Sequence, residues 1–217
     1  MDTSMIQNSQ KLKTSSGRNQ YFNNWHGKKD AEIWKCFKDG SESAFVFIYE
    51  QYYDNLVNYG FNFLSHQEVV KDLVQDVFIE LREKRKTIGN TDAIKPFLFT
   101  IIRRKLIKIQ KKRETKNLLS LTYSHEEFTF EFSCEQKLIE RQIQDDQILR
   151  LKQAIKKLSC KEREIVYHFY FENLTYAQIA KIMGYREVKT ARTILYRALA
   201  RLRKTLEHDT FYLLFLV

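Results

Sequence analysis

The chain has 217 residues, a net charge of +10 and 43% hydrophobic residues, with 6 glycines and one proline. This hydrophobic content excludes a wholly disordered chain, and the scarcity of turn-forming residues favours a mostly helical fold over a sheet. Three widely spaced cysteines argue against a disulfide framework or a cysteine-based zinc site. The excess of Lys and Arg favours a polyanionic partner, which is nucleic acid or, less often, a membrane surface.

The first part of the chain predicts a tail and a helical domain. Residues 1–28 are polar and predict a disordered tail. Apolar residues then recur three and four apart, which predicts helices separated by Gly-containing loops at 39–41 and 88–90. We expect one helical domain over 29–115. Its last helix, from about Lys95 to Arg113, has Phe97, Leu98, Ile101, Ile102, Leu106 and Ile109 on one side.

The second part predicts a linker and another helical domain. Residues 126–146 hold seven acids and two bases, so we read 116–145 as an acidic linker and 146–217 as a second domain. Capping-box patterns begin at Ser159 and Thr175. The helix after Ser159 is expected to bury Ile165, Val166 and Phe169. The final helix carries an apolar stripe of Val188, Ala191, Leu195, Ala198 and Leu202.

The positive charge is concentrated in two predicted helices. Residues 103–116 carry a net charge of +7 and residues 186–204 carry +6, which leaves −3 for the rest of the chain. A surface that serves only solubility mixes both signs, so the two patches suggest two contacts with DNA. For each patch, a solvated basic face is the alternative.

Residues 175–202 have the spacing of a helix-turn-helix. A short apolar helix meets a tight turn at Gly184, and the second helix carries basic residues opposite its apolar stripe. The N-terminal part of such a helix reaches base edges in the major groove. A helical hairpin without DNA-binding function is the alternative.

Several segments resemble bacterial RNA polymerase sigma factors. Residues 158–164 (LSCKERE), 174–180 (LTYAQIA) and 190–198 (TARTILYRA) resemble sigma region four. Residues 40–45 (GSESAF), 72–78 (DLVQDVF) and 96–104 (PFLFTIIRR) resemble sigma region two. Because the two regions follow in order without a third between them, the layout resembles the extracytoplasmic-function (ECF) class.

The resemblance implies an all-α protein with two small helical domains joined by an acidic linker, which acts in transcription initiation with core RNA polymerase and promoter DNA. Minus-ten recognition and strand melting would fall to Phe97, Phe99, Arg103, Arg104, Lys105 and Lys108. Because side chains two apart on a helix face differently, we expect one phenylalanine to be buried and the other available. Minus-thirty-five recognition would fall to Arg186, Lys189, Thr190, Arg192, Thr193 and Arg197.

A predicted helix before the first basic patch carries acids at steps of four. Like charges at this spacing repel, and an ordinary solvated face is the alternative to a function. The resemblance implies that this helix docks on a coiled coil of the largest polymerase subunit. The docking candidates are Asp72, Gln75, Asp76 and Glu80.

Two other classes of function compete with this reading. The first is an ordinary helix-turn-helix regulator, which needs no polymerase-docking helix. The second is an enzyme acting on nucleic acid, but the five histidines are scattered and no phosphate-cradling glycine loop is present. We therefore expect a cytoplasmic protein that is not an enzyme, with no catalytic residues, metal, cofactor, small-molecule substrate or membrane insertion. The sequence leaves open whether an anti-sigma protein binds it.

Overall fold

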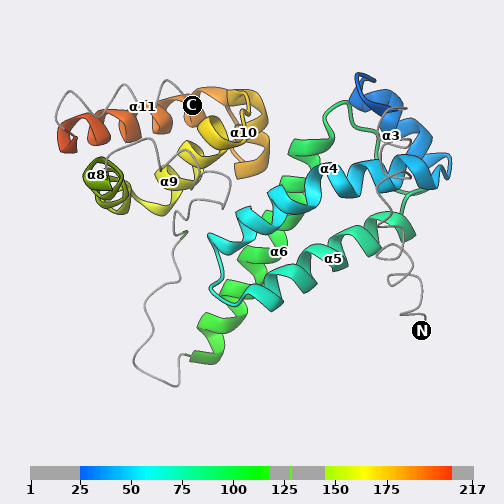
Figure 1. Ribbon diagram of the computed structural model, residues 1–217, viewed down its shortest axis with the longest axis horizontal. Helices are drawn as coiled ribbons and strands as arrows, with labels where there is room; N and C mark the ends of the chain where they lie inside the picture. The colour runs from blue at the N-terminus through cyan, green and yellow to red at the C-terminus, as the bar shows by residue number, and fades with distance from the viewer. Residues whose placement is uncertain (1–24, 118–127, 129–144, 207–217) are drawn as a thin grey trace. The chain divides into compact units, whose positions relative to one another are not determined.

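The computed structural model describes residues 25–117, 128 and 145–206, and all regular elements in this part of the chain are helices (Figure 1). The predicted all-α class is confirmed. The acidic linker, apart from residues 116, 117, 128 and 145, and the end of the chain from residue 207 lie outside the described residues. The helices are α3 (Asp30–Lys38), α4 (Glu42–Phe61), α5 (Gln67–Glu83), α6 (Ile94–Asn117), α8 (Asp145–Lys156), α9 (Cys160–Val166), η1 (Tyr167–Phe171), α10 (Tyr176–Met183) and α11 (Val188–Thr205).

The first of two compact units comprises Met1–Asp54 and Gln75–Lys95. After α3, Gly40 adopts a φ of 103°, which favours glycine, so the loop predicted at 39–41 is confirmed. The loop predicted at 88–90 is held by α3, because Trp34 is 1% exposed and its Nε1 donates to the Gly89 carbonyl at 3.0 Å.

The second unit comprises Asn55–Val74 and Pro96–Val217. Here α4 and α5 approach closely at Gly60, where an added Cβ would lie 2.5 Å from Val70 Cγ1. In the same unit, α11 packs against α8, α9 and α10.

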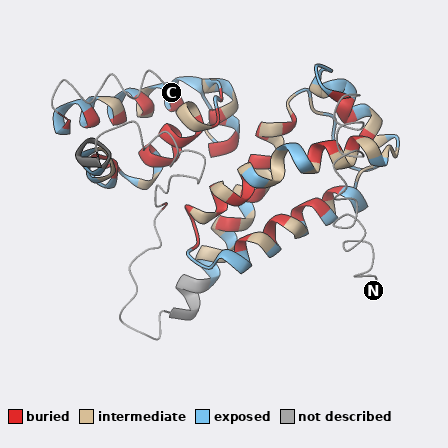
Figure 2. Ribbon diagram, viewed as in Figure 1, coloured by how far each residue is buried: buried red, intermediate tan, exposed pale blue. Residues whose placement is uncertain are grey.

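Buried positions recur along α11 every three or four residues (Figure 2). They include Ala191, Leu195, Ala198 and Leu202, as the apolar stripe predicted. Val188 was expected on the same stripe but is 48% exposed. It is the first residue of the helix and lies beyond the packed part of the stripe.

The segment after α9 departs from the predicted pattern. Residues Tyr167–Phe171 form a π-helix, whose wider turn shifts the residues that face the core. As a result, Tyr167 and His168 are buried, whereas Phe169, which was predicted to be buried, is only half-buried.

None of the helices described here combines the length and apolar content that crossing a membrane requires.

Candidate nucleic-acid interface

The predicted helix-turn-helix is formed by α10 and α11. Thr175 and Gln178 form a capping box at the start of α10. The backbone amide of Gln178 donates to Thr175 Oγ1 at 3.3 Å, and the backbone amide of Thr175 donates to Gln178 Oε1 at 2.9 Å. Gly184 ends α10 with a φ of 71°, a left-handed conformation that glycine adopts at low cost. The chain therefore turns directly from α10 into α11.

The candidate base-reading residues lie mostly on the exposed face of this second helix. Because the opposite stripe is buried against α9 and α10, the polar face of α11 is presented to solvent. Its size and positive charge fit a DNA major groove. Arg186, Lys189, Thr190, Arg192 and Arg197 are exposed, and Thr193 is half-buried.

One base of the +6 run has a structural role. Arg201 Nη1 donates to Glu162 Oε2 at 2.9 Å, and the same carboxylate oxygen accepts the backbone amide of Ser159 at 2.9 Å. Glu162 thus closes the predicted capping box of α9 and also holds the recognition helix.

The two phenylalanines of α6 differ in exposure, as expected. Phe97 is half-buried, whereas Phe99 is 0% exposed and packs against Tyr59 with ring centroids 5.1 Å apart. Phe99 therefore cannot stack on a DNA base in this structure, and the prediction that it does so was wrong. Phe99 lies one turn from buried Ile102 and two turns from buried Leu106, so it belongs to the core stripe of α6.

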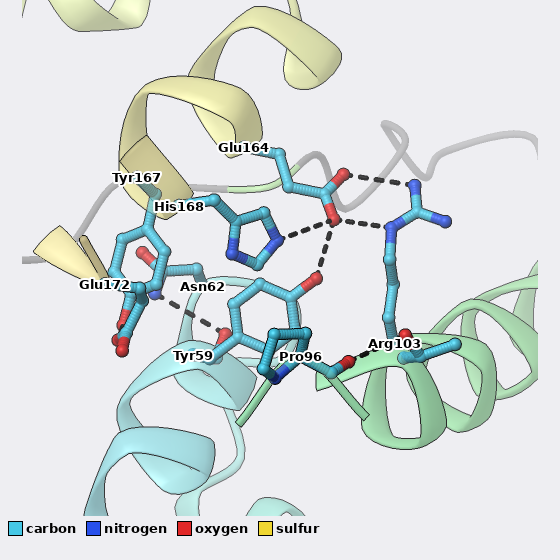
Figure 3. Close-up of polar contacts among 9 residues, drawn as sticks. Tyr59, Asn62, Pro96, Arg103, Glu164, Tyr167, His168 and Glu172 are labelled. Carbon is cyan, nitrogen blue, oxygen red and sulfur yellow. Dashed lines mark hydrogen bonds and ion pairs between the residues drawn. The ribbon is translucent and has the colours of Figure 1, made fainter. Parts of the chain in front are cut away.

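The basic residues of α6 also separate into two groups. Arg104 and Lys108 are exposed, and Lys105 is half-buried. Arg103 instead forms a buried ion pair with Glu164 of α9: its Nε donates to Oε1 at 2.6 Å and its Nη2 donates to Oε2 at 3.2 Å (Figure 3). Only 16% of the Arg103 side chain and 5% of the Glu164 side chain are exposed. In this structure Arg103 is therefore not available to DNA.

Glu164 is the centre of a cluster of polar side chains, the Glu164 cluster, which comprises Tyr59, Arg103, Glu164 and His168. The Tyr59 hydroxyl donates to Glu164 Oε1 at 2.6 Å, and His168 Nε2 lies 3.8 Å from the same oxygen (Figure 3). Burial alone raises the pKa of Glu164, but the contacts with His168 and Arg103 outweigh it and lower the pKa to about 2. Burial and the neighbouring Glu164 raise the pKa of the Tyr59 phenol. The cluster therefore holds an ionised carboxylate.

Aromatic rings and a second glutamate surround this cluster. Phe128, from the segment predicted as linker, is 2% exposed, with its ring centroid 5.2 Å from that of Phe63 and 5.8 Å from that of Tyr167. Glu172 is 4% exposed and accepts hydrogen bonds from Asn55 Nδ2 at 3.2 Å and from the Tyr167 hydroxyl at 3.0 Å. These contacts join α4, η1 and one linker residue in one buried group.

The acidic candidates lie one turn apart on α5. Asp72 and Asp76 are exposed, whereas Gln75 and Glu80 are half-buried. Glu80 Oε2 also lies 3.6 Å from Nζ of Lys84, the residue that follows the helix. Exposed apolar residues occur on the same helix, with Val69 36% and Ile79 40% exposed, so the helix offers both acidic and apolar groups to a partner.

Sequence reasoning missed the residues that contact the candidate arginines. Glu164 pairs with Arg103 and accepts a hydrogen bond from Tyr59. The rings of Tyr176 and Tyr196 lie next to Arg192. Glu164 directly follows three charged residues, 161–163, so the local sequence carries no signal that its side chain is buried. Among the described residues, no group of three or more His, Cys, Asp or Glu side chains is placed to hold a metal ion.

Two family models match the chain. Residues 48–115 match sigma-70 region 2 and residues 148–202 match sigma-70 region 4, so together they span more than half of the chain. The chain is also similar to curated proteins of Bacillus subtilis. It is 27% identical to RNA polymerase sigma factor YlaC over 73% of this chain and 90% of that protein, and 23% identical to ECF RNA polymerase sigma factor SigX over 76% and 85%.

Two solved structures share the fold. One is CnrH in complex with the cytosolic domain of CnrY, with a TM-score of 0.57, 18% identity and coverage of 84% of this chain and 99% of that one. The other is the sigma factor RpoE in complex with the anti-sigma factor NepR from Bartonella quintana. Its TM-score is 0.57 and its identity 22%, with coverage of 74% of this chain and 95% of that one.

Proposed function

We propose a specific role for each of three helices in this chain, which belongs to the sigma-70 family of RNA polymerase sigma factors and is of the extracytoplasmic-function type. In this proposal α11 reads the minus-thirty-five element, α6 binds the minus-ten element, and α5 docks on core polymerase. As a sigma factor the chain acts in transcription initiation, with core RNA polymerase and promoter DNA as its partners. An ordinary helix-turn-helix regulator is not favoured, because residues 48–115 match a region that such a regulator does not need.

The observation that carries the upstream assignment is the exposed face of α11. Arg186, Lys189 and Arg192 all lie at or near its N-terminal end and are exposed. Arginine can donate two hydrogen bonds to guanine, and lysine can contact bases or phosphates. Thr190, Thr193 and Arg197 complete the proposed set.

For the minus-ten element, the proposal uses the exposed side of α6. Arg104 and Lys108 are exposed and would contact the phosphate backbone, with Lys105 beside them. Phe97 is the remaining aromatic candidate for stacking on an unpaired base. Arg103 would join this surface only after its ion pair with Glu164 opens.

Docking on the polymerase is proposed for Asp72, Gln75, Asp76 and Glu80. A basic partner surface would offset the repulsion among the three acids on one helix face. The exposed Val69 and Ile79 would add apolar contact area.

The direct test is reconstitution with core polymerase. The full chain is mixed with core enzyme, and transcripts are sequenced after initiation on a library of genomic fragments. Core enzyme alone is the control. The proposal expects new start sites that share upstream elements. It would be wrong if the chain failed to bind core enzyme and instead bound palindromic DNA as a dimer.

Other parts of the proposal rest on the family. Sigma factors direct initiation while the polymerase carries out nucleotidyl transfer, so we propose that the chain itself catalyses no reaction and acts in the cytoplasm, where polymerase and promoters meet. We also propose the division into 1–28, 29–115, 116–145 and 146–217. An anti-sigma protein is a further proposed partner, supported by the anti-sigma factor bound to RpoE in its solved structure.

A further inference from the structure

Arg192 on the recognition helix lies next to two aromatic rings that sequence reasoning did not assign to DNA binding. Its Cζ is 5.6 Å from the ring centroid of Tyr196, one turn further along α11, and 6.0 Å from that of Tyr176, the first residue of α10. A guanidinium within about 6 Å of a ring centroid is attracted by the electrons of the ring face. Both helices of the helix-turn-helix therefore contribute a ring to the same cation.

These rings are themselves held in place. Tyr176 stacks on Phe169 of η1, with ring centroids 5.1 Å apart and an interplanar angle of 26°. Its backbone lies within the capping box that Thr175 and Gln178 form. Tyr196 lies on α11 next to buried Leu195, which packs in the core. A hydrogen bond with Arg192 and the charge of its guanidinium lower the pKa of the Tyr196 phenol.

Tyr196 is 54% exposed, which is high for so large a side chain. Arg192 is exposed as well, and within the described residues it pairs with no carboxylate. The guanidinium has five N–H donors, so a hydrogen bond to the Tyr196 hydroxyl leaves other donors for a base. Ring contact and a two-bond contact to a base are therefore compatible.

We propose that Tyr176 and Tyr196 are positioning residues for Arg192, which they hold with its donors directed at a guanine of the upstream promoter element. Holding the side chain before DNA binds reduces the conformational entropy that is lost on binding. The inference rests on the proposed role of α11, and it adds how this helix prefers guanine at one position of the upstream element. The ligand is the N7 and O6 edge of a guanine in the major groove.

The experiment uses holoenzyme made from core polymerase and the full chain. It selects among promoter duplexes that are randomised across the upstream element, and the enrichment of each base at each position is read by sequencing. Arg192→Ala should abolish guanine preference at one position, a loss of about 5- to 100-fold. Tyr176→Ala and Tyr196→Ala should each reduce preference at that same position by about 2- to 5-fold.

Conservative variants and a charge control separate positioning from a structural effect. Tyr176→Phe and Tyr196→Phe keep the rings and should retain most of the guanine preference. Lys204→Ala removes one exposed charge from the last turn of the same helix, and it should weaken binding without changing base preference. Thermal unfolding of every variant checks that the helix-turn-helix still folds.

The inference is overturned if the two alanine variants keep the guanine preference, if they weaken all positions equally, or if the phenylalanine variants behave like the alanine ones. Unchanged selection by Arg192→Ala would also overturn it, while leaving the sigma-factor function intact. If wild-type holoenzyme enriches no upstream element, both the inference and the proposed role of α11 fail.

Discussion

Nε of Arg103 and Oε1 of Glu164 lie 2.6 Å apart, although the two residues are 61 positions apart in the chain. Arg103 belongs to the segment that matches sigma-70 region 2, and Glu164 to the segment that matches region 4. A cation expected to contact promoter DNA is thus neutralised by a carboxylate from the other family region.

Replacing Glu164 by Gln should increase the affinity of the free chain for DNA. The substitution removes the charge that holds Arg103, so the guanidinium becomes available to a phosphate. One additional phosphate contact makes the slope of log affinity against log salt steeper by about 0.9. Fluorescence anisotropy with a labelled duplex over a salt series measures this slope.

Glu172→Gln is the matched control for this experiment. Glu172 is another buried glutamate of the same unit, and it accepts hydrogen bonds from Asn55 and Tyr167. Its substitution should leave the salt slope unchanged. Equal slopes for wild type and Glu164→Gln would show that Arg103 does not reach DNA after its partner is removed.

The Glu164 cluster should also make stability depend on pH. The pKa of Glu164 is lowered from 4.5 to about 2 in the folded chain, so folding favours the ionised form. Its stabilising contribution is fully present above about pH 4.5 and is lost as the pH falls towards 2. We expect this group to account for on the order of 3 kcal/mol over that window.

Chemical denaturation at pH 7, 4.5 and 3 tests this expectation. The difference in unfolding free energy between wild type and Glu164→Gln should shrink as the pH is lowered. Glu32→Gln, at an exposed position in α3, should follow the wild-type profile. A constant difference between wild type and Glu164→Gln would contradict the assignment of an ionised buried Glu164.

Reversing the charge of Asp72 and Asp76 to Lys should abolish binding to core polymerase while leaving helical content intact. Both side chains are exposed, so the double variant removes few packing contacts and changes the charge of the docking face from negative to positive. Far-ultraviolet circular dichroism and gel filtration with core enzyme measure the two properties. The double variant Glu32→Lys and Asp92→Lys makes the same charge change at exposed positions elsewhere and should still bind. Normal holoenzyme formation by the Asp72 and Asp76 variant would rule out this docking face.

The acidic linker predicts a further, salt-dependent effect on DNA binding. Residues 126–146 carry a net charge of −5 between two basic segments, and opposite charges attract most strongly at low salt. Replacing the linker acids by Ser or Gln should therefore tighten DNA binding of the free chain, with the gain disappearing as salt rises. Electrophoretic mobility shifts at low and high salt measure it, and an unchanged affinity at low salt would mean that the linker does not mask the DNA-binding helices.

The sequence by itself determined those features that depend on local spacing. Helical periodicity, the capping boxes at Ser159 and Thr175 and the turn at Gly184 each depend on a few neighbouring residues, and the structure contains all of them. The exposed face of α11 also follows from one period of 3.6 residues along a single helix. Wherever that period changed, as in the π-helix at Tyr167–Phe171, the predicted burial of Phe169 failed.

Only the tertiary structure decided which charged and aromatic residues are available. Arg103 and Arg104 are neighbours in sequence, yet one is paired with a buried carboxylate and the other is exposed. Their difference arises from Glu164, a residue far along the chain that no helical period relates to them. Likewise, the rings near Arg192 come from two helices that meet only after the turn at Gly184 has formed. Contacts between distant residues depend on packing of the whole chain, and local sequence patterns contain no information about that packing.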